Sequence, residues 1–155
     1  MAGEDLQAKP NYSFILDTGI ILRYLWKIRQ AADLLEFLQQ IGEIHVSAIT
    51  YMEILIGHKP KEEESIRLFF DRVQPLVVSQ EVAEKSAFLI RKYQAVFGKK
   101  NPRRFPDALI AATAWQQQGT LVTLDKKHFD NTKIKEFTIR TIDQETEDWV
   151  SQLKV

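Results

Sequence analysis

Short apolar runs alternate with helix-like segments along this 155-residue chain, and that alternation restricts the fold more than any other feature. Five runs are predicted to be strands: 12–16, 44–46, 75–78, 120–124 and 137–142. The predicted helices cover 20–26, 31–42, 47–56, 61–73, 79–97 and 107–118. Strands that alternate with helices are typical of a parallel sheet covered by helices on both faces. The sequence therefore predicts an α/β fold with a central, mostly parallel sheet.

Composition narrows the function classes. The length suits one domain, and 21 basic side chains balance 21 acidic ones, which excludes the uniformly basic surface of a histone-like protein. Cysteine is absent, so the chain has no disulfide, thiolate metal site or cysteine nucleophile. No apolar stretch is long enough to span a membrane, and residues 1–10 are polar rather than typical of a signal peptide. We therefore expect a cytoplasmic protein.

Four acids stand out because their neighbours are apolar: Asp17, Glu53, Asp107 and Asp125. Asp17 follows the first predicted strand and Asp125 the fourth, and open α/β sheets bind ligands at the carboxyl ends of strands. Taken alone, each acid could instead be a helix cap or an acid at the edge of an apolar segment. Asp107, in a first helical turn, would also interact favourably with the helix dipole. No basic partner lies within the apolar segments of the four. We therefore expect them to meet in one site.

Four converging carboxylates repel one another unless a cation neutralises them. Because cysteine is absent and the three histidines lack metal-site spacing, the expected ion is one that prefers oxygen ligands, Mg²⁺ or Mn²⁺. Such an ion can activate water and stabilise charge on a phosphoryl group. Thr18 and Thr123 are candidate hydroxyls beside the acids.

Basic residues flank two of the acids. Arg103 and Arg104 precede Asp107, while Lys126 and Lys127 follow Asp125. An acidic centre with basic neighbours suits a polyanion such as RNA, although charge runs of this kind also occur as solvated loops. His128, taken alone, is interpreted as a surface residue.

The chain resembles PIN-domain ribonucleases of the VapC toxin type in four segments: FILDTGIILRYL, ITYMEILIG, PDALIAATA and TLVTLDKKHFD. The resemblance covers 11–142 and implies a three-layer α/β/α PIN-like fold with Asp17, Glu53, Asp107 and Asp125 as the catalytic, metal-binding set. It further implies dependence on Mg²⁺ or Mn²⁺, a single-stranded or tRNA-like RNA substrate, a homodimer, and an antitoxin partner that inserts a segment into the active-site groove. Two departures are Gly19, where the family commonly has asparagine, and His128, where many members have an acid. Asp130 is therefore a candidate fifth acid.

The predicted organisation is an extension over 1–10, a PIN-like nuclease domain over 11–142, and a tail over 143–155 with a helix at 145–153. The predicted function is metal-dependent endoribonuclease and toxin. A catalytically silent PIN-like module that binds RNA or protein is the alternative, and retention of all four acids favours the enzyme. A phosphoacceptor receiver domain fits less well, because Ser79 and Gln80 follow the third predicted strand where that fold has an aspartate.

Overall fold

A sheet of parallel strands forms the centre of the computed structural model, which describes residues 12–98, 100–129 and 133–153. Its strands are β1 (Tyr12–Leu16), β2 (Gly42–His45), β3 (Thr120–Thr123) and β4 (Thr138–Thr141). They lie side by side in the order β2-β1-β3-β4. The parallel sheet predicted from the alternating pattern is thus confirmed.

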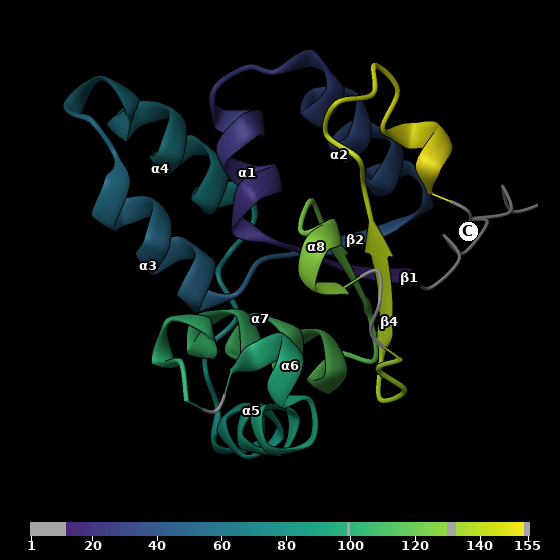
Figure 1. Cartoon of the computed structure of the whole chain (residues 1–155). Helices are drawn as coiled ribbons and strands as arrows, with labels where there is room; N and C mark the ends of the chain where they lie inside the picture. Colours follow the sequence, from purple (N-terminus) through teal and green to yellow (C-terminus); the bar gives the residue numbers. More distant parts are fainter. Residues whose placement is uncertain (1–11, 99, 130–132, 154–155) are drawn as a thin grey trace, which may run out of the picture.

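Helices cover both faces of this sheet, with α1 and α2 on one side and α5, α6 and α7 on the other (Figure 1). The α-helices are α1 (Thr18–Leu25), α2 (Arg29–Ile41), α3 (Ala48–Gly57), α4 (Glu63–Arg72), α5 (Gln80–Lys92), α6 (Gln94–Phe97), α7 (Phe105–Gln116) and α8 (Lys126–Phe129). Three short 3₁₀ turns accompany them: η1 (Pro60–Glu62), η2 (Pro102–Arg104) and η3 (Val150–Gln152). This arrangement confirms the three-layer α/β/α fold. Across the described ranges, every helix falls short of the length and hydropathy that a membrane crossing requires.

The central strand β1 is buried on both faces. Phe14 and Leu16 pack into the hydrophobic cluster beneath α1, α2 and α4, whereas Ile15 packs into the cluster beneath α5 and α7. Successive side chains of a strand point to opposite faces, so a strand covered on both sides needs apolar residues throughout. This is why β1 appears in the sequence as an unbroken apolar run.

The carboxyl ends of β1 and β3 meet at one edge of the sheet. The backbone N–H of Asp17 donates to the carbonyl oxygen of Val122 at 3.0 Å, which joins the end of β1 to β3. Asp17 then caps α1, and Ser47 caps α3 by accepting a hydrogen bond from the Ile49 N–H. Both helices therefore start beside this edge.

Three predicted elements differ in the structure. The predicted strand at 75–78 is reduced to one isolated bridge between Ser47 and Leu76 within the described residues, and the second strand is shifted to Gly42–His45. The single long helix predicted over 79–97 is wrong, because it divides into α5 and α6 at Tyr93. The Tyr93 hydroxyl donates to Glu136 at 2.6 Å, a contact 43 residues away that helical periodicity does not report.

The tail differs as well. In place of the helix predicted over 145–153, the described residues form turns followed by the 3₁₀ turn η3. Trp149 and Leu153 are nevertheless buried in the same cluster as Leu34 and Leu38 of α2, so the tail packs on the domain. The predicted extension over 1–10 lies outside the described residues, and the domain limits 11–142 stay a prediction.

Candidate active site

Asp17 is held by the two threonines predicted to lie beside the acids. Its Oδ1 accepts a hydrogen bond from the Thr18 N–H at 2.8 Å, and its Oδ2 accepts one from the Thr123 hydroxyl at 2.6 Å. Burial raises the pKa of the Asp17 carboxyl, although these two hydrogen bonds oppose that effect. These two hydrogen bonds favour the charged form of the Asp17 carboxyl, which lies at the end of β1.

Glu53 reaches the same place from α3. Its Oε1 accepts a hydrogen bond from the Thr18 hydroxyl at 2.8 Å, and that hydroxyl also lies 3.0 Å from the hydroxyl oxygen of Thr50. Burial raises the pKa of Glu53, and the nearby charge of Asp17 raises it further. Thr18 therefore links α1, which Asp17 caps, to α3, which carries Glu53.

Asp107 lies in the first turn of α7. Burial raises its pKa to about 6, and the charges of Asp17, Glu53 and Asp125 act in the same direction. The Arg104 guanidinium opposes this, with its Nη1 atom 2.7 Å from Asp107 Oδ2. Asp107 therefore has Arg104 as its ion-pair partner, while the other three acids disfavour its charged form.

Asp125 follows β3 and has the most cationic surroundings of the four. Its Oδ2 lies 3.2 Å from Arg104 Nη2, and its Oδ1 lies 2.9 Å from His128 Nδ1. Burial tends to raise the pKa of Asp125, but hydrogen bonds from His128 and the charges of His128 and Arg104 outweigh it and lower the pKa. Its backbone N–H donates to the Thr123 hydroxyl at 3.1 Å, so Thr123 connects Asp17 with Asp125.

Arg104 is enclosed by the site. Its side chain is 18% exposed, and its Nε donates to the carbonyl oxygen of Val96 at 3.1 Å, while its two terminal nitrogens contact Asp107 and Asp125. The basic partner of the acids thus comes from outside their apolar segments. Arg104 stands three residues before Asp107, in the turn η2 that precedes its helix.

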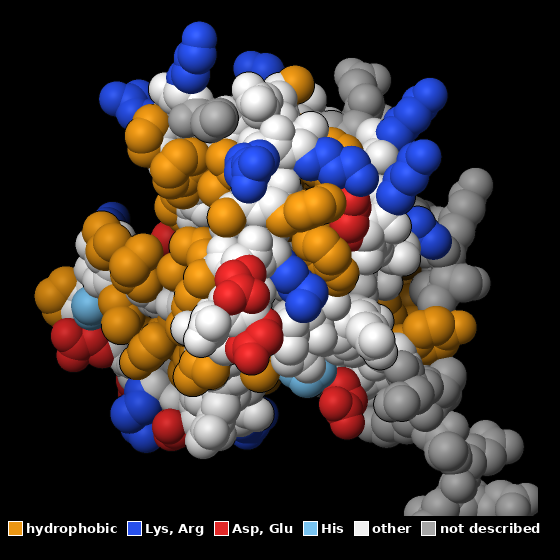
Figure 2. All heavy atoms as spheres, turned by 90° about the horizontal axis from the view of Figure 1, so that it is seen from below, with side chains coloured by type: hydrophobic (Ala, Val, Ile, Leu, Met, Phe, Trp, Pro, Cys, Tyr) orange, Lys and Arg blue, Asp and Glu red, His pale blue; other side chains and the backbone are white. Residues whose placement is uncertain are grey.

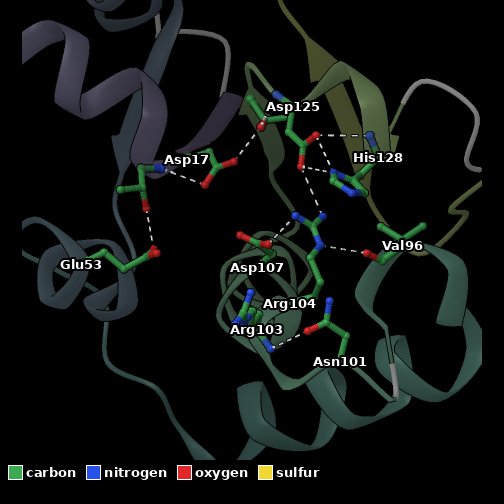
Figure 3. A network of polar contacts seen from close by, with 11 residues as sticks. Asp17, Glu53, Val96, Asn101, Arg103, Arg104, Asp107, Asp125 and His128 are labelled. Carbon is green, nitrogen blue, oxygen red and sulfur yellow. Dashed lines mark hydrogen bonds and ion pairs between the residues drawn. The ribbon is translucent and has the colours of Figure 1, made fainter.

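The carboxylates of Asp17, Glu53 and Asp107 point toward one shared space, and Arg104 lies between Asp107 and Asp125 (Figure 3). Arg103 is exposed, and so are Lys126 and Lys127 in α8. Among the residues that the structure describes, no three acids or histidines close around one point as ligands of a single metal ion would. Asp130 lies outside the described residues.

Sequence reasoning placed His128 on the surface, whereas the structure puts its ring against Asp125. The available signal was spacing: His128 lies three residues after Asp125, and Arg104 lies three residues before Asp107. In a helical turn, residues three apart are neighbours. Both bases could have been assigned to the acids on that ground.

The model of the PIN domain family matches residues 14–135. The chain belongs to the PIN domain family. Among curated PIN-domain relatives, Ribonuclease VapC19 of Mycobacterium tuberculosis is 30% identical over 74% of this chain and 90% of its own length. Ribonuclease VapC1 of Methanocaldococcus jannaschii is 26% identical over 88% of this chain and 91% of its own length. The resemblance to VapC-type PIN domains is confirmed.

Solved structures with this PIN fold include complexes. A toxin-antitoxin complex from Klebsiella pneumoniae has a chain that is 28% identical, with a TM-score of 0.64, and the match covers 81% of this chain and 98% of that one. A chain of VapBC2 from Rickettsia felis, bound to a DNA fragment from its promoter, has a TM-score of 0.69 at 21% identity, over 84% of this chain and 99% of that one. The second likeness shows the fold alone.

Proposed function

We propose that this PIN domain is a metal-dependent endoribonuclease and the toxin of a toxin–antitoxin pair. The observation that carries the proposal is that the carboxylates of Asp17, Glu53 and Asp107 point toward one shared space, where Asp107 is half-buried and the other acids raise its pKa. A buried charge in such surroundings needs a cation. The names of the curated relatives support RNA as the substrate.

The donor set fits a divalent ion that prefers oxygen. Asp17, Glu53 and Asp107 present carboxylate oxygens to one space, and these residues, with Asp125, would hold Mg²⁺ or Mn²⁺. The bound ion would supply an activated water and stabilise the charge that develops on the phosphoryl group. Thr18 and Thr123 orient the carboxylates through the hydrogen bonds described above.

The substrate would lie along the basic residues next to the acids. Arg103, Lys126 and Lys127 are exposed and would bind RNA phosphates, and Arg104 would join them when it is not paired with Asp107 and Asp125. We propose single-stranded or tRNA-like RNA as the substrate, because its backbone is flexible enough to enter a site at a sheet edge. Asp130 remains a candidate fifth acid.

The proposed protein partners are an antitoxin and a second copy of this chain. The toxin-antitoxin complex from Klebsiella pneumoniae supports the first. For the second copy, the supporting observation is a set of large apolar side chains exposed on α3 and on residues 77–78, which follow Leu76 beside the start of α3. Figure 2 shows hydrophobic side chains gathered toward the left of the face that it draws. These residues, which we call the α3 patch, are Met52, Leu55, Ile56, Val77 and Val78.

The metal assignment is tested by Asp17→Asn and Asp107→Asn. Asparagine keeps the shape of the side chain but removes a charge, so each variant should lose at least about a hundredfold of the Mn²⁺-dependent rate of RNA cleavage, the scale of a lost electrostatic contribution. The rate would be measured on a defined single-stranded RNA with and without Mn²⁺. The matched control is Asp33→Asn, because Asp33 is exposed and pairs with Arg29 on α2.

Wild-type rates in both variants would contradict the metal assignment. Wild-type protein that binds RNA without cutting it at any Mn²⁺ concentration would favour the alternative, a catalytically silent RNA-binding module. The ion pairs of Arg104 with two of the acids are the feature of the site that would suit such a module.

A further inference from the structure

We propose that Arg104 is an intramolecular counterion that occupies the cation position between Asp107 and Asp125, so that its guanidinium and a divalent ion compete for these carboxylates. The inference rests on the proposed metal site and adds a residue that opposes metal binding there. Arg104 would then be a positioning residue that sets the cation affinity of the site.

The geometry of the guanidinium supports this role. Nη1 lies 2.7 Å from Asp107 Oδ2 and Nη2 lies 3.2 Å from Asp125 Oδ2, so one planar group bridges two acids from different elements. The Val96 carbonyl oxygen accepts a hydrogen bond from Arg104 Nε at 3.1 Å, which holds the guanidinium from a third direction. Three directed contacts hold the Arg104 side chain, which is only 18% exposed. Arg104 is therefore a fixed part of the site and not a mobile surface residue.

The same contacts explain why the acids do not close around one point. Asp107 and Asp125 both turn one oxygen to Arg104, while Asp125 turns the other to His128. A magnesium ion needs carboxylate oxygens at about 2.1 Å in octahedral geometry. The guanidinium nitrogen within hydrogen-bond distance of Asp107 Oδ2 makes this oxygen a weaker ligand for such an ion, because the two cations repel at close range.

This arrangement has a physical consequence for folding. In the metal-free protein, Arg104 neutralises part of a cluster that would otherwise destabilise the fold. The cost is a weaker metal site, because binding must first displace a favourable ion pair. The released guanidinium would stay in the turn η2, next to the exposed Arg103.

The test measures Mn²⁺ binding to metal-free protein by isothermal titration calorimetry. Arg104→Gln should bind Mn²⁺ about tenfold more tightly than wild type, the scale expected when a charged hydrogen-bonded competitor is removed. Arg104→Lys, which has a single point charge and cannot bridge both acids, should fall between the two. Arg103→Gln is the matched control and should bind as wild type does, because its side chain is exposed.

A second measurement uses the unaltered protein. On titration with Mg²⁺, the side-chain Nε–H resonance of Arg104, assigned with Arg104→Lys, should shift as the guanidinium leaves Asp107 and Asp125. Because a nearby ion can shift this resonance even if the ion pairs stay intact, the shift is interpreted together with the Mn²⁺ affinities of Arg104→Gln and Arg104→Lys. Arg104→Gln should also melt at a lower temperature than wild type without metal and gain more from added Mn²⁺.

The outcomes separate this inference from the proposed function. If wild type and Arg104→Gln bind Mn²⁺ equally, or Arg104→Gln binds more weakly, competition is wrong while the metal site stands. If neither binds Mn²⁺, both the metal site and the competition are wrong. If Arg104→Gln fails to fold, Arg104→Lys and the Nε–H resonance decide, and an unshifted resonance together with wild-type affinity in Arg104→Lys overturns the inference.

Discussion

Asp107 is the residue at which burial and charge conflict most directly. Its side chain is 28% exposed and lies among three other acids, and Arg104 is its cationic neighbour within the described residues. Burial raises its pKa from 3.8 to about 6, so the folded state retains a proton that the unfolded chain has already released. The free energy of unfolding must therefore depend on pH through this residue.

The sign of this dependence follows from the raised pKa. Below about pH 4 both states are protonated and Asp107 contributes nothing, whereas between about pH 4 and 6 only the folded state binds the proton. The free energy of unfolding of the metal-free protein should therefore fall as pH rises through that window, by roughly 3 kcal/mol at most. Urea unfolding of wild type and Asp107→Asn at several pH values tests this. The variant stays neutral, so its stability should be close to that of wild type near pH 4, and its advantage over wild type should grow toward pH 6 and then level off.

Asp33→Asn is the control, because it removes a carboxylate that is exposed and pairs with Arg29 on α2 instead of with the site. Parallel curves for wild type and Asp107→Asn would show that the Asp107 carboxyl titrates as an ordinary surface acid. Saturating Mg²⁺ should lower the pKa of Asp107 and remove the dependence.

At the scale of elements, the junction between α2 and β2 is the place where a described glycine leaves the least space for a side chain. Gly42 ends α2 and starts β2, where it lies opposite Tyr12 of β1. A Cβ atom at Gly42 would lie 2.4 Å from the Tyr12 carbonyl oxygen and 2.8 Å from Tyr12 Cβ. Backbone cannot yield as a flexible side chain can, so this position requires glycine because of space.

Gly42→Ala should therefore destabilise the protein by about 1–3 kcal/mol, the usual cost of overpacking. Gly57→Ala is the matched control, because a Cβ there meets nothing within 4 Å and alanine favours the end of α3. Urea denaturation should show a lower free energy of unfolding for Gly42→Ala and an unchanged or slightly higher one for Gly57→Ala. Equal stabilities would show that β1 and β2 can separate to admit the methyl group.

At the scale of the whole molecule, the α3 patch is an apolar surface that the described part of the chain leaves uncovered. Ile56 is 77% exposed and Val77 is 74% exposed, while Leu76, next to Val77, pairs with the start of α3. Contiguous exposed apolar side chains mark interaction surfaces more often than isolated ones do. A second copy of this chain is the proposed partner.

Ile56→Asp should convert a dimer into a monomer, because it places a charge at the most exposed residue of the proposed apolar interface. Size-exclusion chromatography with light scattering would measure the mass at several concentrations. Leu68→Asp is the control: Leu68 is 49% exposed on α4 but lines a different pocket with Tyr24 and Leu35, so its mass should equal that of wild type. Monomeric wild-type protein at all concentrations would contradict the proposed homodimer.

The sequence by itself determined the parallel sheet, the strand β1 and the acids at its carboxyl edge. Apolar runs such as 12–16 are local patterns, and their burial on both faces leaves few other folds. Asp17 and Asp125 could be assigned to one edge because strand ends in a parallel sheet coincide. These inferences needed only near neighbours in the chain and general rules of topology.

Only the tertiary structure decided how that edge is charged and where elements stop. Tyr93, where the helix divides, donates to Glu136, Trp149 is buried in the same cluster as the apolar residues of α2, and Arg104 pairs with Asp125, 21 positions away. Each is a contact between distant parts of the chain, and its energy depends on geometry that no local pattern contains. For the same reason, the sequence showed which residues are acidic at this edge, whereas the fold decided that an arginine lies between two of them.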